Sequence, residues 1–119
     1  MPEVMKIYLA TPVNGRKEKT MRDKQRAAYK RIVEMSVYLH RRFNDADFVS
    51  SFDYVEPGVI LSEPCIMGHC VQLVMECDMI ILDDGWENSS GCSVERFVAM
   101  QYGKKVQTMN YFKMMDKIG

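Results

Sequence analysis

Residues 78–106 read DMIILDDGWENSSGCSVERFVAMQYGKKV and indicate the fold class more clearly than any other segment. Residues 79–82 form a continuous apolar run, as expected for a strand that helices cover on both faces. A polar loop, an amphipathic helix over 90–102 and a second strand follow, and Gly103 suits the left-handed stop of that helix. This order of strand, helix and strand predicts a parallel sheet with right-handed crossovers.

Elsewhere the chain also alternates between short apolar runs and longer periodic segments. The last ten residues are expected to form a short helix or an interface arm. The sequence therefore predicts one three-layer α/β domain over residues 1–119, with a small parallel sheet of about four or five strands. Strands are expected over 5–10, 48–52, 79–82 and 106–109, and helices over 18–43, 65–77 and 90–102.

The spacing of apolar residues predicts the buried face of two of these helices. The long helix is expected to bury Ala28, Ile32, Met35, Leu39 and Phe43, and the helix over 90–102 to bury Val94, Phe97, Val98 and Tyr102.

Composition narrows the class of protein. With 119 residues and 47% hydrophobic residues, the chain is long and apolar enough for one globular core. No apolar run approaches the roughly 20 residues of a membrane span, and the N-terminus lacks the layout of a signal peptide, so a cytoplasmic protein is expected.

The four cysteines include no C-x-x-C pair. We therefore expect free thiols, no metal site and no cofactor.

The net charge of zero hides a strong segregation of charge. Residues 1–42 hold 11 basic and 4 acidic side chains, whereas residues 43–95 hold 11 acidic side chains and no Lys or Arg. An acidic block of this length argues against binding to nucleic-acid phosphates, so no nucleic-acid partner is expected.

One carboxylate stands beside the expected ligand crevice. The loops 11–17, 53–64 and 83–92 follow strands and should gather at one edge of the sheet, with Glu95 about one turn into the next helix. A carboxylate there can attack an electron-poor sugar carbon, and the helix dipole should keep it ionised. The alternative is that Glu95 only complements the dipole. Ser89 and Ser90 are expected to cap the helix or to bind phosphate.

Several of these segments resemble one enzyme family. Residues 7–12, 77–82, 91–95 and 99–106 are similar to the nucleoside 2-deoxyribosyltransferase superfamily. The similarity is strongest to its short uncharacterised members, which carry a Trp-Glu-x-Ser-x-Gly-Cys/Ala-x-x-Glu run much like residues 86–95.

The resemblance implies a flavodoxin-like sheet and the cleavage or transfer of an N-glycosidic bond in a nucleoside or nucleoside 5′-monophosphate. It implies Glu95 as the covalent nucleophile and Tyr8 as the residue that positions it. It also implies a homodimer or larger homo-oligomer. Ser89 stands where the transferases usually carry an Asp, as in the branch that hydrolyses deoxynucleoside 5′-monophosphates. The expected substrate-binding residues are Thr11, Asn14, Gly15, Arg16, Trp86, Ser89, Ser90 and Gly91.

The resemblance also leaves alternatives open. Where the family usually has an acid that protonates the leaving base, this chain has Cys70 beside His69. His69 is either that acid or an ordinary polar residue of a helix. If no acid is present, the chain is a nucleotide-binding or sensing module without catalysis, and a NAD-cleaving enzyme is a third possibility. Trp86 either stacks on a base or closes a core edge, and Tyr8 is central enough for packing alone to explain it.

Overall fold

The computed structural model describes residues 4–13, 15–53 and 63–118, with side chains of the third range described from Cys70 onward. Its sheet is parallel throughout, in the order β2-β1-β3-β4. The strands are β1 (Lys6–Ala10), β2 (Asp47–Val49), β3 (Met79–Leu82) and β4 (Lys105–Thr108). The helices are α1 (Met21–Leu39), α2 (Glu63–Glu76), α3 (Ser90–Gln101) and α4 (Met109–Ile118), with two short 3₁₀ turns, η1 (Ser51–Asp53) and η2 (Trp86–Asn88).

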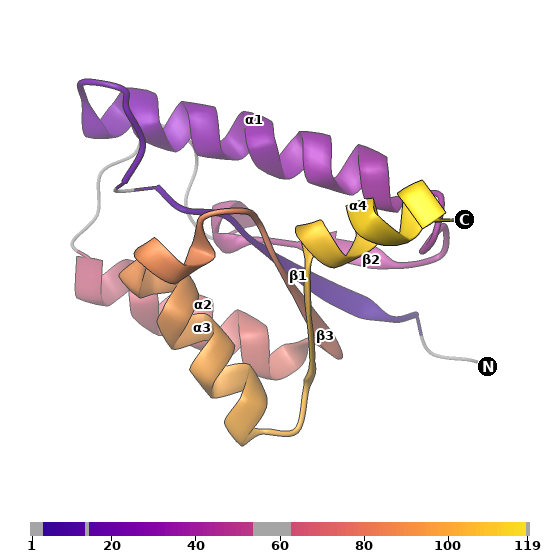
Figure 1. Cartoon of the computed structure of the whole chain (residues 1–119). Coiled ribbons are helices and arrows are strands. Elements are labelled where there is room, and N and C mark those ends of the chain that lie inside the picture. Colours follow the sequence, from indigo (N-terminus) through magenta and orange to yellow (C-terminus); the bar gives the residue numbers. More distant parts are fainter. Residues whose placement is uncertain (1–3, 14, 54–62, 119) are drawn as a thin grey trace.

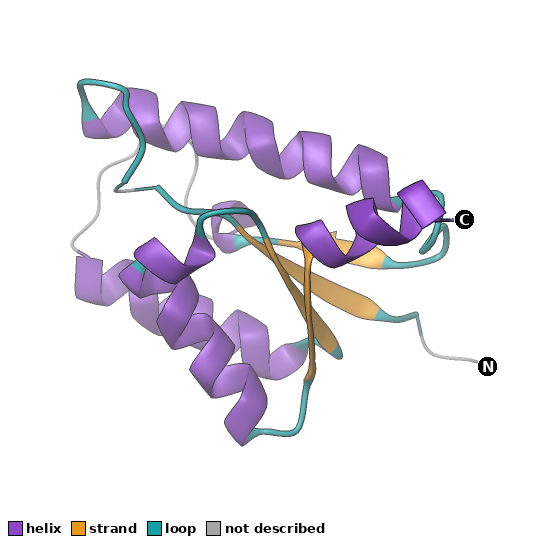
Figure 2. Ribbon diagram, in the orientation of Figure 1, coloured by secondary structure: helices purple, strands orange, loops and turns teal. Residues whose placement is uncertain are grey.

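The helices cover both faces of the sheet. Figure 1 shows α1 and α4 on one face and α2 and α3 on the other, and Figure 2 shows the strands between these two layers. The predicted flavodoxin-like α/β fold with three layers is confirmed. No helix in the described part of the chain combines the length and the apolar character that a membrane crossing requires.

Successive residues of β1 point into two different cores. Ile7 and Leu9 pack with buried residues of α1 and α4, whereas Tyr8 and Ala10 pack with buried residues of α2 and α3. This alternation follows from the two-residue repeat of a strand, and both faces are apolar because helices cover both.

The strand order reverses between β1 and β3. The chain leaves β1 toward β2 on one side and returns to β3 on the other, with Tyr8 paired to Val49 and Ile80. In open parallel sheets, ligands bind where the strand order reverses, beyond the carboxyl ends of the strands. The loops after β1 and β3 border that position.

Helix α3 is rotated from its predicted orientation. Cys92, Glu95 and Ala99 are its buried residues, whereas Phe97 and Tyr102 are 61% and 60% exposed. Val94 is also exposed, so the prediction of an inward face was wrong for Val94, Phe97 and Tyr102, whereas Val98 packs against the core as predicted. The small side chains of Cys92 and Ala99 let the helix lie close to the sheet, and Glu95 then reaches Tyr8.

In helix α1 the predicted stripe is confirmed. Ala28, Ile32, Met35 and Leu39 are buried, and Phe43 packs against their core from beyond the helix end. The helix is shorter than the predicted 18–43. It begins after Thr20, whose hydroxyl accepts a hydrogen bond from the Asp23 amide, and ends at Leu39.

The second strand is also shorter than predicted. It ends at Val49 instead of 52, because the Asp53 carboxylate accepts a hydrogen bond from the Ser50 amide and turns the chain into η1. Helix α2 and strand β4 lie within two residues of their predicted bounds, and Gly103 has the expected positive φ of 69°. The last residues form helix α4, which buries Met109 and Phe112.

Candidate active site

A buried tyrosine and a buried glutamate meet on the α2 and α3 side of the sheet. Tyr8 lies in the middle of β1 and is 1% exposed, and Glu95 lies on α3 and is 6% exposed. The Tyr8 hydroxyl donates a hydrogen bond to Oε2 of Glu95. Glu95 is in the second turn of α3, since the helix begins at Ser90, and no acidic residue occupies the first turn. A role that only complements the helix dipole therefore does not account for its position.

Cys70 of α2 completes a buried cluster with this pair. Its buried thiol adjoins Tyr8 and Glu95, and burial, together with the Glu95 charge, raises its pKa to about 12. Burial, together with the Glu95 charge, also raises the pKa of Tyr8 well above its usual value. Both groups therefore keep their protons at neutral pH and act there as hydrogen-bond donors.

The protonation of Glu95 is set mainly by burial. Burial raises the pKa of its carboxyl to about 7, although the hydrogen bonds from Tyr8 and Cys70 oppose the rise. The raised pKa runs against the expectation that the helix dipole keeps Glu95 ionised, because the loss of solvation outweighs the stabilisation of the charge. Ionised and neutral forms coexist near neutral pH.

The N-terminus of α3 is capped from within the chain. Ser89 is the N-cap residue, and its hydroxyl accepts a 3.3 Å hydrogen bond from the Cys92 amide. Capping is one of the two roles predicted for Ser89 and Ser90, and the structure assigns it to Ser89. Ser90 is exposed, and Gly91 is partly buried.

Trp86 lies at the edge of the α2 and α3 core. It is half-buried, packs against that core, and has the Arg96 guanidinium 5.0 Å from its ring centre. The two interpretations of Trp86 were base stacking and closure of a core edge. The second describes its position, because the core and Arg96 already contact its ring.

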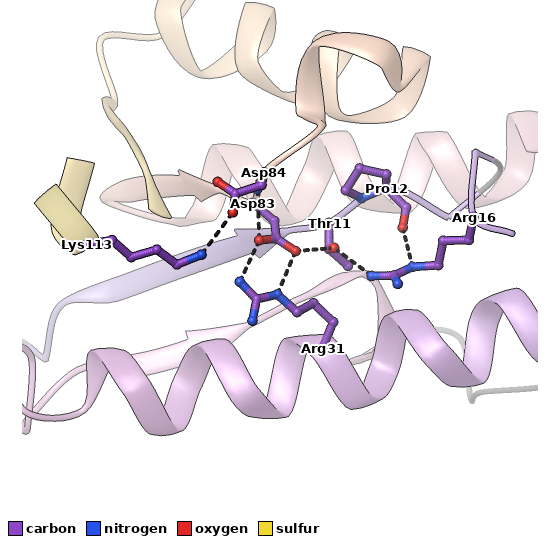
Figure 3. Close-up of polar contacts among 7 residues, drawn as sticks. All are labelled: Thr11, Pro12, Arg16, Arg31, Asp83, Asp84 and Lys113. Atoms are coloured by element: carbon purple, nitrogen blue, oxygen red, sulfur yellow. Dashed lines mark hydrogen bonds and ion pairs between the residues drawn. The ribbon is translucent and has the colours of Figure 1, made fainter. Parts of the chain in front are cut away.

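The loops after β1 and β3 are joined by a polar network, drawn in Figure 3. Asp83 is buried and accepts two 2.8 Å hydrogen bonds from Arg31 of α1 and one of 2.7 Å from the Thr11 hydroxyl. Arg16 donates to the Thr11 hydroxyl and to the Pro12 carbonyl. The role of Arg31 was not predicted. Two features of the sequence point to this role. Arg31 is next to Ile32, which belongs to the buried stripe of α1, and residues 43–95, which include Asp83, contain no Lys or Arg.

An open pocket of about 470 Å³ lies next to this network, on the α1 and α4 side. Of the predicted site residues, Gly15 and Arg16 line it, whereas Tyr8 and Glu95 do not. The structure therefore divides the predicted site into a buried Tyr8–Glu95 pair and a separate pocket at the strand ends. The described residues that line the pocket are Pro12, Gly15, Arg16, Arg31, Asp83, Asp84, Gly85, Asn88 and Lys113.

Asn14 and the side chain of His69 lie outside the described residues. Within the described part of the chain, no group of three or more His, Cys, Asp and Glu side chains is arranged to hold a metal ion.

The comparisons with known proteins agree with this fold. The family model described as "Domain of unknown function (DUF4406)" matches residues 5–108. The chain belongs to this family. No curated protein matches the sequence of this DUF4406 chain. Among solved structures, it is similar to a 2-desoxiribosyltransferase from Leishmania mexicana, with 20% identity and a TM-score of 0.58. The match covers 87% of the DUF4406 chain and 63% of the Leishmania chain. At this identity, the similarity establishes a shared fold.

Proposed function

We propose that this protein cleaves or transfers the N-glycosidic bond of a nucleoside or nucleoside 5′-monophosphate, with Glu95 as the nucleophile. The observation that carries the proposal is the buried Tyr8–Glu95 hydrogen bond. A buried carboxylate that a tyrosine holds in one orientation is suited to covalent attack on a sugar carbon. The fold shared with a deoxyribosyltransferase and the motif resemblance around residues 78–106 support the same reaction class.

The proposed reaction has two steps. The ionised Glu95 carboxylate attacks the anomeric carbon, a carbon–oxygen bond forms, and the bond to the base nitrogen breaks. The electron pair of the broken bond leaves with the base, which takes up one proton. Water or a second base then attacks the same carbon, loses one proton and releases the Glu95 carboxylate.

The proposal gives separate roles to the groups around Glu95. Tyr8 orients the carboxylate and stabilises its charged form, as its effect on the pKa of Glu95 indicates. His69 is the proposed proton donor to the leaving base, since histidine titrates near neutral pH and the pKa of the Cys70 thiol, about 12, makes it a poor donor.

Base release tests this function. The full chain is incubated with deoxynucleosides, deoxynucleoside 5′-monophosphates and NAD, and free base is measured. Glu95→Gln keeps the size of the side chain and is expected to reduce base release at least about a hundredfold. Glu87→Gln is the matched control, because Glu87 is an exposed carboxylate of η2, just before α3. Base release by Glu95→Gln at the wild-type rate would contradict the assignment.

A specific observation favours a second candidate, a nucleotide-binding module without catalysis. Cys70 stands where the resemblance expects a carboxylate, and its buried thiol is a weak acid. Nucleotide binding by the wild-type protein without base release from any of the three substrate classes would favour this candidate. Base release that depends on Glu95 would reject it.

We further propose that the protein forms a homo-oligomer through α3. The exposed side of this helix carries Val94, Phe97 and Met100, and Tyr102 follows as the C-cap residue; each is at least 40% exposed. Large apolar side chains gathered on one face commonly mark a protein interface.

A further inference from the structure

The segregation of charge along the sequence becomes a segregation between the two faces of the fold. The layer of α1, the turn after it and α4 (residues 21–42 and 109–118) holds nine Lys or Arg and three Asp or Glu. The helices of the opposite layer, α2 and α3, hold one Arg, no Lys and three Glu. Figure 1 shows these two layers on opposite sides of the sheet. The α1 and α4 layer is therefore the positive face of a chain whose net charge is zero.

Four cations of this positive face are exposed to solvent and lie outside every ion pair between described residues. Arg26 and Lys30 are one turn apart on α1, so they share one side of the helix. Arg41 follows the end of α1, and Lys117 is in the last turn of α4. No described carboxylate neutralises these charges, so they attract an anionic partner.

Helix α4 is apolar on its outer side as well as its inner side. Met109 and Phe112 face the core. The exposed apolar side chains of α4 are Tyr111, Met114, Met115 and Ile118, each at least 40% exposed. Their steps of three and one residues, repeated over the helix, place them on one face. Ile118 is 80% exposed, which no packing within the described chain explains.

The outer side of α4 adjoins the end of α1. Asp116 accepts hydrogen bonds from Tyr38 and Arg42, and the Arg42 guanidinium lies 5.5 Å from the centre of the Phe112 ring. On α1, Val33 and Val37 are also exposed, and their four-residue step places them on one side of the helix. Exposed apolar side chains and unpaired cations thus occur together in this layer.

We propose that the α1 and α4 layer docks peripherally onto an anionic lipid bilayer. Exposed Lys and Arg are attracted to acidic headgroups, and apolar side chains beside them enter the boundary between headgroups and acyl chains. Both helices keep their inner faces in the protein core, so they lie against the bilayer without leaving the fold. This contact does not depend on base release or on Glu95.

The chemistry of the surface favours a bilayer over two other partners. A nucleic acid would match the charge, but single-strand binding uses aromatic side chains that stack on bases, whereas this surface exposes mainly Val, Met and Ile. The apolar face of α3 lies in the layer where carboxylates exceed cations, which suits a protein contact and not an anionic surface.

Vesicle flotation of the full chain tests the proposal. Neutral vesicles of phosphatidylcholine are compared with vesicles in which about a third of the lipid is phosphatidylserine. We expect the protein to float with the anionic vesicles and to remain unbound with the neutral ones. High salt should weaken the binding, because it screens the attraction between exposed charges.

Two substitutions test the apolar part of the surface. Ile118→Asp and Met114→Asp place a charge on the exposed side of α4, and each is expected to weaken binding to anionic vesicles roughly tenfold or more. Ile118→Leu keeps the apolar character and is expected to retain binding. Met75→Asp is the matched control, because Met75 is an exposed methionine of α2 in the opposite layer.

Two further substitutions test the charge. Arg26→Gln and Lys30→Gln each remove an exposed cation and are each expected to weaken binding roughly fivefold. Lys105→Gln removes an exposed cation of β4, outside α1 and α4, and is expected to leave binding nearly unchanged.

The proposal is overturned if the wild-type protein binds neutral and anionic vesicles equally or binds neither. Wild-type binding by both Ile118→Asp and Met114→Asp, with circular dichroism showing folded proteins, would also overturn it. A DNA or RNA duplex serves as the competing probe. Binding of the duplex without binding of anionic vesicles would reject the bilayer and assign the positive face to nucleic acid.

Discussion

The hydroxyl of Tyr8 donates a hydrogen bond to the carboxylate of Glu95, and both side chains are almost fully buried. The two residues lie 87 positions apart in the sequence and meet because β1 is a central strand and Tyr8 points into the core that residues of α2 and α3 share. Burial raises the pKa of Glu95 to about 7, and the hydrogen bond from Tyr8 opposes this rise. Tyr8 therefore controls both the orientation and the charge of the proposed nucleophile.

Removal of the Tyr8 hydroxyl should shift the pH dependence of base release. Tyr8→Phe keeps the ring but loses a donor that stabilises the ionised carboxylate, so the pKa of Glu95 should rise above about 7. We expect base release to fall more at pH 6 than at pH 8. The measurement is kcat/KM against pH for both proteins. An equal loss at every pH would indicate that Tyr8 serves packing alone.

The elevated pKa of Glu95 also predicts how stability depends on pH. The folded protein holds the Glu95 proton up to about pH 7, whereas the unfolded chain releases it near the ordinary value of 4.5. Between these values the folded state binds more protons, so this group makes the protein less stable as pH rises, by roughly 3 kcal/mol in total. Glu95→Gln cannot ionise and should therefore gain stability relative to wild type between pH 5 and pH 8. Urea unfolding at both pH values measures the difference, and an equal difference at both would contradict the shifted pKa.

The Asp83 network should contribute far more to stability than the neighbouring ion pair. Asp83→Ala leaves Arg31 and Thr11 without their acceptor and should cost roughly 2–3 kcal/mol in free energy of unfolding. Asp84→Ala is the matched control. It breaks only the pair with Lys113, whose two side chains are 58% and 39% exposed, and should cost less than about 1 kcal/mol.

The contribution of Asp83 to the free energy of unfolding depends on pH with the opposite sign to that of Glu95. Because the pKa of Asp83 is lowered on folding, its contribution is complete above the ordinary carboxyl range and is lost as pH falls through the lowered value. The loss in free energy of unfolding caused by Asp83→Ala should therefore be smaller at acidic pH. Chemical denaturation at pH 7 and pH 3 checks this, and similar losses for the Asp83 and Asp84 variants would refute the central role of Asp83.

The exposed face of α3 should control the oligomeric state. Phe97→Glu places a charge on a side chain that is 61% exposed, so the fold should persist while association is lost. Light scattering after size-exclusion chromatography measures the mass in solution. Val37→Glu on α1 is the control, since Val37 is 68% exposed on the other side of the sheet. A wild-type monomer would reject the proposed homo-oligomer.

The layers of the fold could be predicted because local patterns specify them. The apolar run at 79–82 indicates a strand covered on both faces, and the stripe from Ala28 to Leu39 indicates the helix face that packs on the sheet. The orientation of α3 could not be predicted in this way. Its inward face contains Glu95, and a periodicity count based on apolar residues assigns a charged residue to the solvent side.

The candidate site was predictable only in part, for a related reason. The resemblance identified Tyr8 and Glu95, which the fold then brought into contact. The charged network depends on contacts across the sheet edge, such as the pairing of Arg31 with Asp83 over 52 residues. The position of Arg31 beside the buried stripe of α1 does not indicate which carboxylate it pairs with. The raised pKa of Glu95 results from burial in the folded structure, which the sequence alone does not give. The sequence indicated only the opposite effect, that of the helix dipole.

The covalent intermediate on Glu95 tests the account most directly. Wild-type protein and Glu95→Gln are mixed with a substrate from which base is released, quenched in acid during turnover, and examined by intact and peptide mass spectrometry. We predict a glycosyl adduct on the wild-type peptide that contains Glu95, and none on the same peptide of Glu95→Gln. Base release without an adduct on that peptide, at equal rates in the two proteins, would contradict the role of Glu95 as nucleophile.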